Sequence, residues 1–164
     1  MVHRLGLVGV IVAAFVAGTG CDTARSAKDI PAGLVPFSGT VTLDGEPLAS
    51  ATITLIPTAP AGGSALDSGA VTDSNGRYEL KSAEGRASGA LPGEYRVVIS
   101  RLTKPDGTVV AHSREKSPMQ LMTEENARES LPARYSSPMD TTLTVTVPSG
   151  GGTSDFKLES DKSQ

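Results

Sequence analysis

The stretch "AVTDSNGRYEL", residues 70–80, decides how the rest of the chain is interpreted. Asp73, Ser74, Asn75 and Gly76 stand in a row between two runs that alternate apolar and polar residues. Asp and Asn bond to their own backbone and Gly accepts a positive φ, so the row is typical of a tight turn between two strands. The same side chains carry oxygen atoms of the kind that bind Ca²⁺. The choice between a turn and a ligand site depends on the sequence around it.

Alternation with a period of two continues on both sides of this turn and predicts strands. Most of these runs have one polar face, and turn residues separate them. This pattern is typical of an all-β fold, an antiparallel seven-stranded β-sandwich. The turn residues Asp44-Gly45-Glu46-Pro47 predict a hairpin between the first two strands. The predicted strands lie in residues 37–43, 51–57, 70–72, 78–80, 91–100, 141–147 and 155–159.

Residues 102–138 interrupt this pattern with a connection far longer than the usual ~4 to 6 residues. The run "SPMQLMTEENARESLP" predicts a short helix that starts near Ser117 or Pro118 and ends before Pro132. We expect this segment either to be a surface excursion without a ligand or to carry a binding site. In a binding site, Tyr135 is the candidate residue on which a ligand would stack. The apolar residues expected to cover one end of the sandwich are Met119, Leu121, Met122 and Leu131.

The N-terminus is typical of an export signal, because a short basic start precedes an apolar run at residues 5–17 that is shorter than a spanning helix. An uncleaved membrane anchor is the alternative. Cys21 is the only cysteine, so no intramolecular disulfide can form. It follows small residues as in a bacterial lipobox, although Gly18 stands where such boxes usually carry Leu. We expect a signal peptide at 1–20 and lipidation of Cys21, against a free thiol with ordinary cleavage nearby. Acyl chains of this kind anchor a soluble domain to a membrane.

Charge and aromatic content narrow the class of partner. Removal of residues 1–20 leaves 14 basic residues against 18 acidic ones, a net charge of −4. This balance argues against nucleic acid as a partner, because its binding depends on phosphate neutralisation. Aromatic residues make up 4% of the chain and Trp is absent, so stacking platforms are scarce. Residues 21–36 are small and polar and suit a tether, and residues 160–164 form a polar tail.

Three segments together resemble a known family: "SGTVTLDGEPLASATITLIP", "VTDSNGRYEL" and "LPGEYRVVIS". They are similar to the carboxypeptidase regulatory-like domain, a transthyretin-like or prealbumin-like Greek-key β-sandwich. The later run "ESLPARYSSPMDTTLTVTVPSGGGTSDFKL" resembles lipoproteins of planctomycete bacteria that carry such a domain behind a lipobox. The resemblance spans residues 36–159 and places the domain at 37–159. It implies a non-catalytic module, and it leaves the ligand open.

The chain carries few of the residue patterns that catalysis or metal binding requires. After loss of the signal His112 is the remaining histidine, and no Gly-x-Ser-x-Gly elbow accompanies it, so zinc and Ser-His-Asp chemistry are disfavoured. The chain also ends without the Tyr-Arg-Gly-Ser motif of the hydroxyisourate hydrolases that share the transthyretin-like fold. We expect no cofactor. Weak calcium candidates are Asp67, Asp73 and Asn75, but Arg77 follows Gly76 where an EF-hand loop would continue, and we favour the turn.

The sequence thus predicts an exported, lipid-anchored, non-catalytic β-sandwich with a binding or structural role at the cell envelope. It would face the periplasm or the cell surface, with an envelope protein or polysaccharide as the possible partner. The alternative is a carbohydrate- or peptide-recognition domain that uses residues 102–138, and a hydrolase is the least favoured function. A partner strand could also add to an open sheet edge, although the sequence does not indicate which edge is open.

Overall fold

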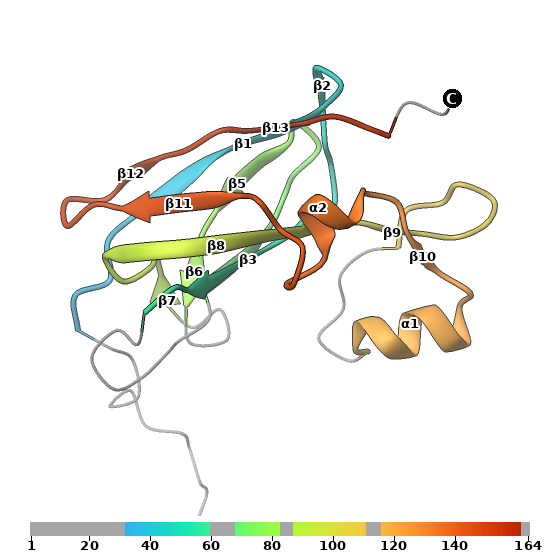
Figure 1. Cartoon of the computed structure of the whole chain (residues 1–164), viewed down its shortest axis with the longest axis horizontal. Coiled ribbons are helices and arrows are strands. Elements are labelled where there is room, and N and C mark those ends of the chain that lie inside the picture. Colours follow the sequence, from blue (N-terminus) through green and yellow to red (C-terminus); the bar gives the residue numbers. More distant parts are fainter. Residues whose placement is uncertain (1–31, 60–67, 83–86, 111–115, 162–164) are drawn as a thin grey trace, which may run out of the picture.

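The computed structural model describes residues 32–59, 68–82, 87–110 and 116–161. Within these ranges the chain is mostly β, with two main sheets in a sandwich-like arrangement and two short helices (Figure 1). The sandwich-like β fold predicted from the alternation is therefore confirmed. The strands are β1 (Phe37–Leu43), β2 (Glu46–Pro47), β3 (Thr52–Pro57), β4 (Ser68–Val71), β5 (Arg77–Glu79), β6 (Lys81–Ser82), β7 (Ala87–Ser88), β8 (Gly93–Ser100), β9 (Leu102–Thr103), β10 (Arg128–Glu129), β11 (Thr144–Val147), β12 (Gly152–Thr153) and β13 (Phe156–Leu158), and the helices are α1 (Pro118–Glu124) and α2 (Ala133–Ser136).

The larger sheet, which we call the β8 sheet, has the strand order β11-β8-β3-β4-β6-β7 and is antiparallel throughout. Its longest ladder joins β3 to β8, from Thr52 opposite Ser100 to Pro57 opposite Tyr95. Successive side chains of a strand point to opposite faces, so the predicted apolar positions all reach one face of this sheet. The buried side chains that β3 and β8 place there are Ile53, Leu55, Tyr95, Val97 and Ile99.

The smaller sheet, the β1 sheet, is built around β1 and departs from the prediction. β1 pairs antiparallel with β2 and β5, but it pairs parallel with β12 and β13. The expectation of a wholly antiparallel fold is therefore wrong for the two C-terminal strands. The chain reaches β12 from β11, which belongs to the other sheet. Such a crossover permits parallel neighbours, whereas a tight hairpin imposes antiparallel ones.

The predicted hairpin between residues 37–43 and 51–57 is also wrong. Asp44 and Gly45 do form the expected turn, with positive φ angles of 52° and 90°. The turn joins β1 only to the short β2, while β3 pairs with β4 and β8 in the other sheet. Between β2 and β3 the chain crosses the core, because Leu48 there is 1% exposed. The residues Asp44 and Gly45 therefore predicted that the chain reverses here, but they did not predict which strand pairs with β1.

Residues 70–80 carry the chain from one sheet to the other and back. β4 precedes the turn in the β8 sheet, β5 follows it and pairs with β1, and β6 then returns to pair with β4. The N–H of Asp73 donates to the carbonyl oxygen of Arg77 at 2.9 Å and closes the predicted turn. The reversal is therefore confirmed, and the strand that leaves it is shared between the two sheets.

Two residues fix this crossing. The Thr72 hydroxyl donates to the Leu48 carbonyl at 2.6 Å and accepts the N–H of Ala51 at 2.9 Å, so it ties the turn to the β2–β3 crossing. Gly76 has a φ of +70°, and a Cβ there would lie 2.4 Å from the Val41 carbonyl oxygen. Only glycine satisfies both conditions at this position.

Gly39 lets the last strands approach β1. A Cβ at Gly39 would lie 1.8 Å from the carbonyl oxygen of Ser154, which reaches over the glycine to accept the Tyr78 hydroxyl at 2.7 Å. The next residue, Asp155, accepts both the N–H and the hydroxyl of Thr40 at 2.8 Å. Burial raises the pKa of Tyr78, and the charge of Asp155 adds to this effect. One small residue thus allows β5, β1 and the β12–β13 segment to lock together.

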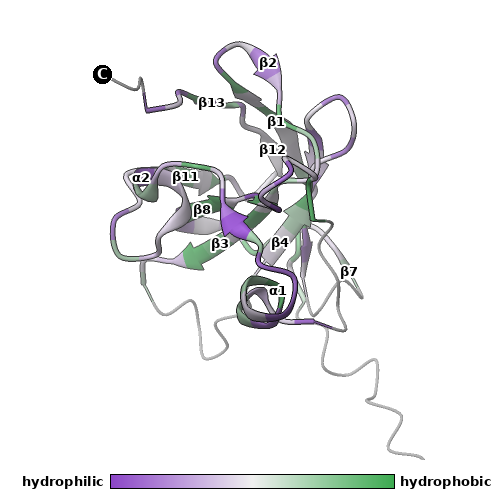
Figure 2. Cartoon of the chain, turned by 90° about the vertical axis from the view of Figure 1, so that its right-hand side faces the viewer, coloured by the Kyte–Doolittle hydropathy of each residue, from purple (hydrophilic) through white to green (hydrophobic). Residues whose placement is uncertain are grey.

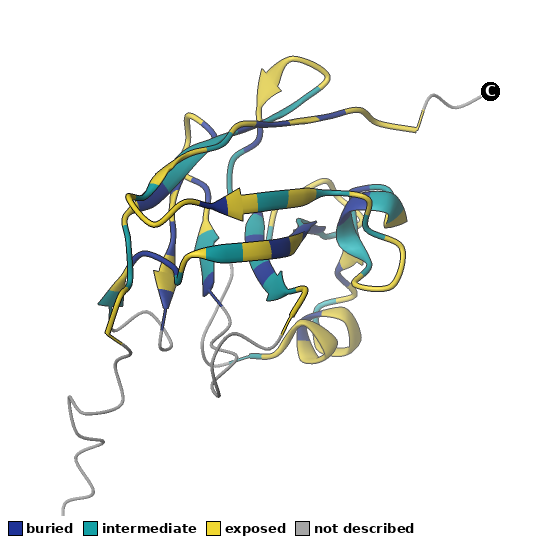
Figure 3. Ribbon diagram, turned by 60° about the vertical axis from the view of Figure 1, so that its left-hand side comes forward, coloured by how far each residue is buried: buried dark blue, intermediate teal, exposed yellow. Residues whose placement is uncertain are grey.

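The core lies between the two sheets. Apolar segments of β3 and β8 lie near the centre of the molecule (Figure 2), and exposed residues gather on α1 and on the loops (Figure 3). No helix among the described residues is long and apolar enough to span a membrane. The core cluster consists of Phe37, Val41, Leu48, Ala51, Ile53, Leu55, Tyr78, Leu80, Ala90, Tyr95, Val97, Ile99, Leu131, Tyr135, Val147, Phe156 and Leu158.

Candidate functional site

The segment 102–138 forms a small structure of its own beside the sandwich, and we call it the excursion. β9 and β10 pair antiparallel, and α1 lies between them in sequence. Leu102, Leu121 and Ala127 form a second buried cluster, with Val110 partly buried against it. Residues 111–115 of the excursion, which include His112, lie outside the described residues. The excursion therefore has its own minimal core.

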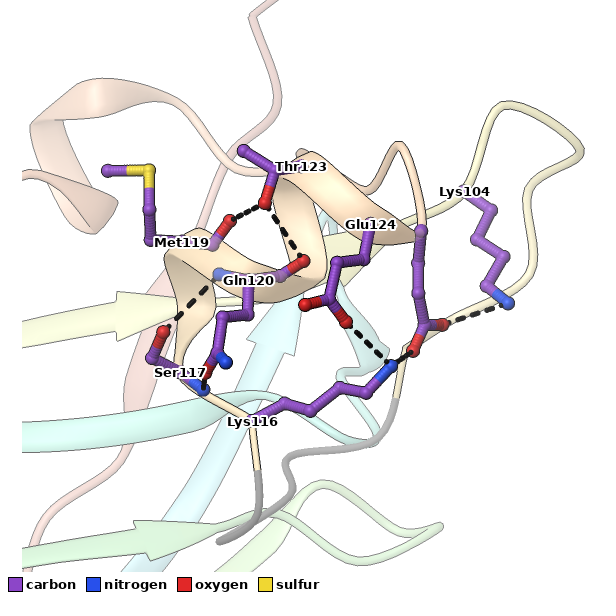
Figure 4. Close-up of polar contacts among 8 residues, drawn as sticks. Lys104, Lys116, Ser117, Met119, Gln120, Thr123 and Glu124 are labelled. Atoms are coloured by element: carbon purple, nitrogen blue, oxygen red, sulfur yellow. Dashed lines mark hydrogen bonds and ion pairs between the residues drawn. The ribbon is translucent and has the colours of Figure 1, made fainter.

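α1 begins where the sequence predicted. Ser117 is the N-cap, its hydroxyl accepts the N–H of Gln120 at 3.3 Å, and the Gln120 side chain accepts the N–H of Ser117 at 2.8 Å (Figure 4). Pro118 follows the cap, where its missing N–H costs nothing. Thr123 bonds back to the carbonyl of Met119 at 2.9 Å. A capping box thus starts this short helix without help from the main core.

Lysines and glutamates join α1 to the loop after β9. Lys116 lies 3.2 Å from Glu124 and 3.0 Å from Glu125, and Lys104 lies 3.0 Å from the other oxygen of Glu125 (Figure 4). Hydrogen bonds from Lys116 and then from Lys104 lower the pKa of Glu125, and its contact raises the pKa of Lys116. These lysine and glutamate side chains are partly exposed to solvent. Their ion pairs therefore hold the side chains in place and add little to the stability of the fold.

Glu129 fastens the excursion to the end of β8. Its carboxylate accepts the Ser100 hydroxyl at 2.6 Å and the N–H groups of Arg101 and Leu131 at 3.0 and 2.9 Å. The Ser130 hydroxyl donates to the Arg101 carbonyl at 2.7 Å. Sequence reasoning did not single out Glu129, because a lone Glu before "SLP" has no pattern that distinguishes it from a solvated charge.

Of the four apolar residues expected to cover one end of the sandwich, two are buried and two are exposed. Leu121 is buried in the excursion cluster and Leu131 in the main core. Met119 is 69% exposed and Met122 38% exposed, so the expectation that they cover the sandwich is wrong. A seven-residue helix cannot bury both faces. The large apolar side chains exposed among the described residues are Val71, Val109, Met119, Met122 and Met139, and all except Val71 belong to the excursion or follow it closely.

Tyr135 lies in α2, a helix that the sequence did not predict. Its side chain is 9% exposed and belongs to the main core. The guanidinium carbon of Arg134 stands 4.8 Å from the ring centroid, and the Tyr135 hydroxyl accepts the N–H of Glu159 at 3.3 Å. A stacking platform needs a free ring face. The Tyr135 ring instead packs in the main core and lies under the guanidinium of Arg134.

The carboxylate of Asp73 forms hydrogen bonds within its own turn. One carboxylate oxygen accepts the N–H of Asn75 at 2.8 Å and the N–H of Arg77 at 2.9 Å, which is the bonding of an Asx turn. Among the described residues no group of three or more His, Cys, Asp or Glu is placed to hold a metal ion. Asp67 lies outside the described residues, as does the lipidation candidate Cys21. Asp73 is therefore bonded as a turn residue, and the calcium site as a set of three residues stays a prediction.

Comparison with known proteins adds little to this geometry. No protein-family model and no curated protein matches the chain. Among solved structures the chain is similar to a 9R-lipoxygenase from Cyanothece PCC8801, with 15% sequence identity and a TM-score of 0.31. The match covers 78% of this chain but only 16% of the lipoxygenase chain. A likeness at this level carries no argument about fold or activity.

Proposed function

We propose that this chain is an exported, lipid-anchored and non-catalytic β-sandwich module with a binding or structural role at the cell envelope. The observation that carries the proposal is Cys21, the sole cysteine, directly after an apolar run and small residues. Two or three acyl chains on this sulfur would hold the domain at a membrane, at about 0.8 kcal/mol for each buried methylene. The periplasm or the cell surface is the compartment that this proposal requires.

The first bridge of the described chain sets the length of the proposed tether. Val35 forms a bridge with Ala90, in which each N–H donates to the carbonyl of the other residue at 2.9 and 3.1 Å. Val35 stands about 14 residues after Cys21, and we propose that the residues between them form the tether. We propose further that the domain is a transthyretin-like Greek-key sandwich of the carboxypeptidase regulatory-like type. Its support is the turn at residues 73–76 and the alternating strands around it.

Membrane fractionation of cells that express the full chain tests the anchor. Cys21→Ser removes the only sulfur that can be acylated, so the protein should move from the membrane pellet to the soluble fraction. Thr23→Ser is the matched control and should stay in the pellet. A Cys21→Ser protein that remains in the pellet to the same extent as the control contradicts the anchoring proposal.

A second candidate function is peptide recognition through the excursion. The supporting observation is the group of exposed apolar side chains there, Val109, Met119 and Met122. Methionine adapts its shape to varied partners, so this group suits a polypeptide. A carbohydrate partner is less favoured, because the ring of Tyr135 is covered.

Binding of the Cys21→Ser chain to washed envelope fractions tests this candidate without a contribution from the anchor. The double variant Met119→Lys with Met122→Lys should reduce the bound fraction at least tenfold. Val71→Lys is the control, because Val71 is comparably exposed at 44% but lies outside the excursion. Equal losses in both variants, or no loss in either, would contradict recognition through the excursion.

A further inference from the structure

The turn between β4 and β5 contains an Asn-Gly pair, Asn75 and Gly76, whose atoms can react with one another. The side-chain amide carbon of Asn75, Cγ, is an electrophile. The backbone nitrogen of the next residue attacks such a carbon once it has lost its proton. Glycine leaves this attack unhindered because it has no side chain. The chain has one other asparagine, Asn126, and there the methyl group of Ala127 hinders the same attack.

The two reacting groups have different surroundings in the folded chain. Asn75 is exposed, whereas Gly76 is buried. The N–H of Gly76 donates to the carbonyl oxygen of Asp73 at 3.0 Å. A base from the solvent must reach this N–H to remove its proton, and both the burial and the hydrogen bond oppose that step. The fold therefore exposes the electrophile and protects the nucleophile.

The carboxylate of Asp73 protects the nucleophile further. One of its oxygens accepts the N–H of Asn75 at 2.8 Å and the N–H of Arg77 at 2.9 Å, and these two amides flank the N–H of Gly76. Loss of the proton from Gly76 would place a second negative charge beside this carboxylate, and like charges repel. The residue that forms the turn therefore also opposes the reaction within it.

We propose that Asn75 is a deamidation site whose rate is set by the opening of this turn. In the opened turn hydroxide takes the proton of the Gly76 nitrogen, and that nitrogen forms a bond to Cγ of Asn75. The bond from Cγ to the side-chain nitrogen breaks, this nitrogen takes up a proton from water, and ammonia leaves a five-membered succinimide behind. Water then opens the ring. Cleavage at Cγ gives aspartate, and cleavage at the backbone carbonyl carbon gives isoaspartate, whose main chain runs through the side chain.

The isoaspartate product does not fit the folded turn, because its main chain is one atom longer between positions 75 and 76. Gly76 has little room to move. Its carbonyl accepts the N–H of Val41 at 2.8 Å, and a Cβ on it would lie 2.4 Å from the Val41 carbonyl oxygen. Arg77 is fixed as well, since it stands opposite Thr40 of β1. The modification therefore makes the opening of the turn permanent and weakens the attachment of β5.

Incubation of the full chain, folded in buffer or unfolded in guanidinium chloride at the same pH and temperature, tests the proposal. Peptide mapping by mass spectrometry, with fragmentation that distinguishes isoaspartate from aspartate, follows Asn75, and Asn126 in the same digest is the internal control. Reaction through an opened turn scales with the open population, so Asn75 should react at least about tenfold more slowly in the folded chain. Equal rates in the two states, or an unfolded Asn75 no faster than Asn126, overturn the proposal.

Asp73→Ala tests the control by the turn within the folded chain. The variant lacks the carboxylate and its two hydrogen bonds, so Asn75 should deamidate at least about fivefold faster than in the parent chain in buffer. Asp106→Ala is the matched control, because Asp106 accepts the N–H of Thr108 at 2.8 Å in a different turn. Equal rates for the two variants would contradict control by the turn.

The stability of the purified product separates the effect of the longer main chain from the effect of the new charge. Asn75→Asp carries the charge on an ordinary main chain and should unfold at the same denaturant concentration as the parent. The isoaspartate form should unfold at a lower concentration. If the two forms unfold together, the tight fit of Gly76 does not exclude the product.

Discussion

The sandwich and the excursion are stabilised in different ways. Seventeen residues form the sandwich core, and the ladder from β3 to β8 supports them over its whole length. The excursion has a buried cluster of three residues of its own and contributes Leu131 and Tyr135 to the sandwich core. Around α1 it depends on a capping box, on the carboxylate of Glu129 and on two lysines. The sheets therefore supply most of the buried apolar contacts of the domain. The part of the excursion around α1 relies mainly on local polar contacts, and its methionines stay exposed.

Gly39→Ala should have the largest effect, because it acts where the two sheets and the last strands meet. The new Cβ would overlap the Ser154 carbonyl, which stands 1.8 Å from its position. Relief of the overlap also breaks the bond from Tyr78, and we expect a loss of about 3–5 kcal/mol in the free energy of unfolding. Chemical denaturation measures this loss. Gly150→Ala is the control, since its Cβ meets nothing within 4 Å, and an equally stable Gly39→Ala would refute the packing described for this site.

A pair of core truncations compares the two apolar clusters directly. Ile53→Ala in the sandwich should cost about 3–4 kcal/mol, because a fully buried site surrounded by two sheets cannot collapse. Leu121→Ala should cost about 1–2 kcal/mol, since the excursion can relax around it. Hydrogen exchange should show faster exchange throughout the sheets for the first variant and only in α1, β9 and β10 for the second. Global effects from both variants would show that the excursion is not a separate unit.

Ser117→Ala tests whether α1 depends on its cap. Loss of the side-chain acceptor should cost about 1 kcal/mol, and the effect should be confined to the helix. Amide exchange of Leu121 and Glu125, which both donate within α1, reports it. Ser137→Ala removes another surface serine near a helix end and should leave those two amides unchanged.

Acid should weaken the ion pairs beside α1, although the effect on stability is small. Hydrogen bonds from Lys116 and Lys104 keep the pKa of Glu125 below its ordinary value of 4.5. A lowered pKa in the folded state means that charged Glu125 stabilises the fold above pH 4.5. This contribution disappears as the pH falls through the lowered pKa. NMR shifts of α1 amides should therefore titrate at acidic pH, and Glu125→Gln should reduce that titration, with the Glu124 carboxylate beside Lys116 left in place.

The sequence specified the faces of strands better than it specified their partners. Alternation predicted the strands that hold Ile53, Val97 and Phe156, and all three side chains are buried in the structure. Asp44-Gly45 indicated a turn correctly, yet the strand that pairs after it is decided by the burial of Leu48, which no local pattern reports. The parallel pairing of β13 depends in the same way on a crossover between sheets.

The candidate sites were harder to predict than the strands. Tyr135 is a rare aromatic in a polar run, and only the packing of α2 shows that the ring belongs to the core. The role of Glu129 depends on three donors from two separate segments, so spacing along the sequence cannot reveal it. Asp73 was predictable as a turn residue because its bonding partners lie within four residues of it.

Intact-mass analysis of the chain purified from membranes tests the central claim most directly. The proposal of a lipid-anchored module predicts an N-terminus at Cys21 and a mass increase that equals a diacylglyceryl group, with or without a further acyl chain. A chain that begins at another residue, or that carries an unmodified Cys21 thiol, would contradict the claim.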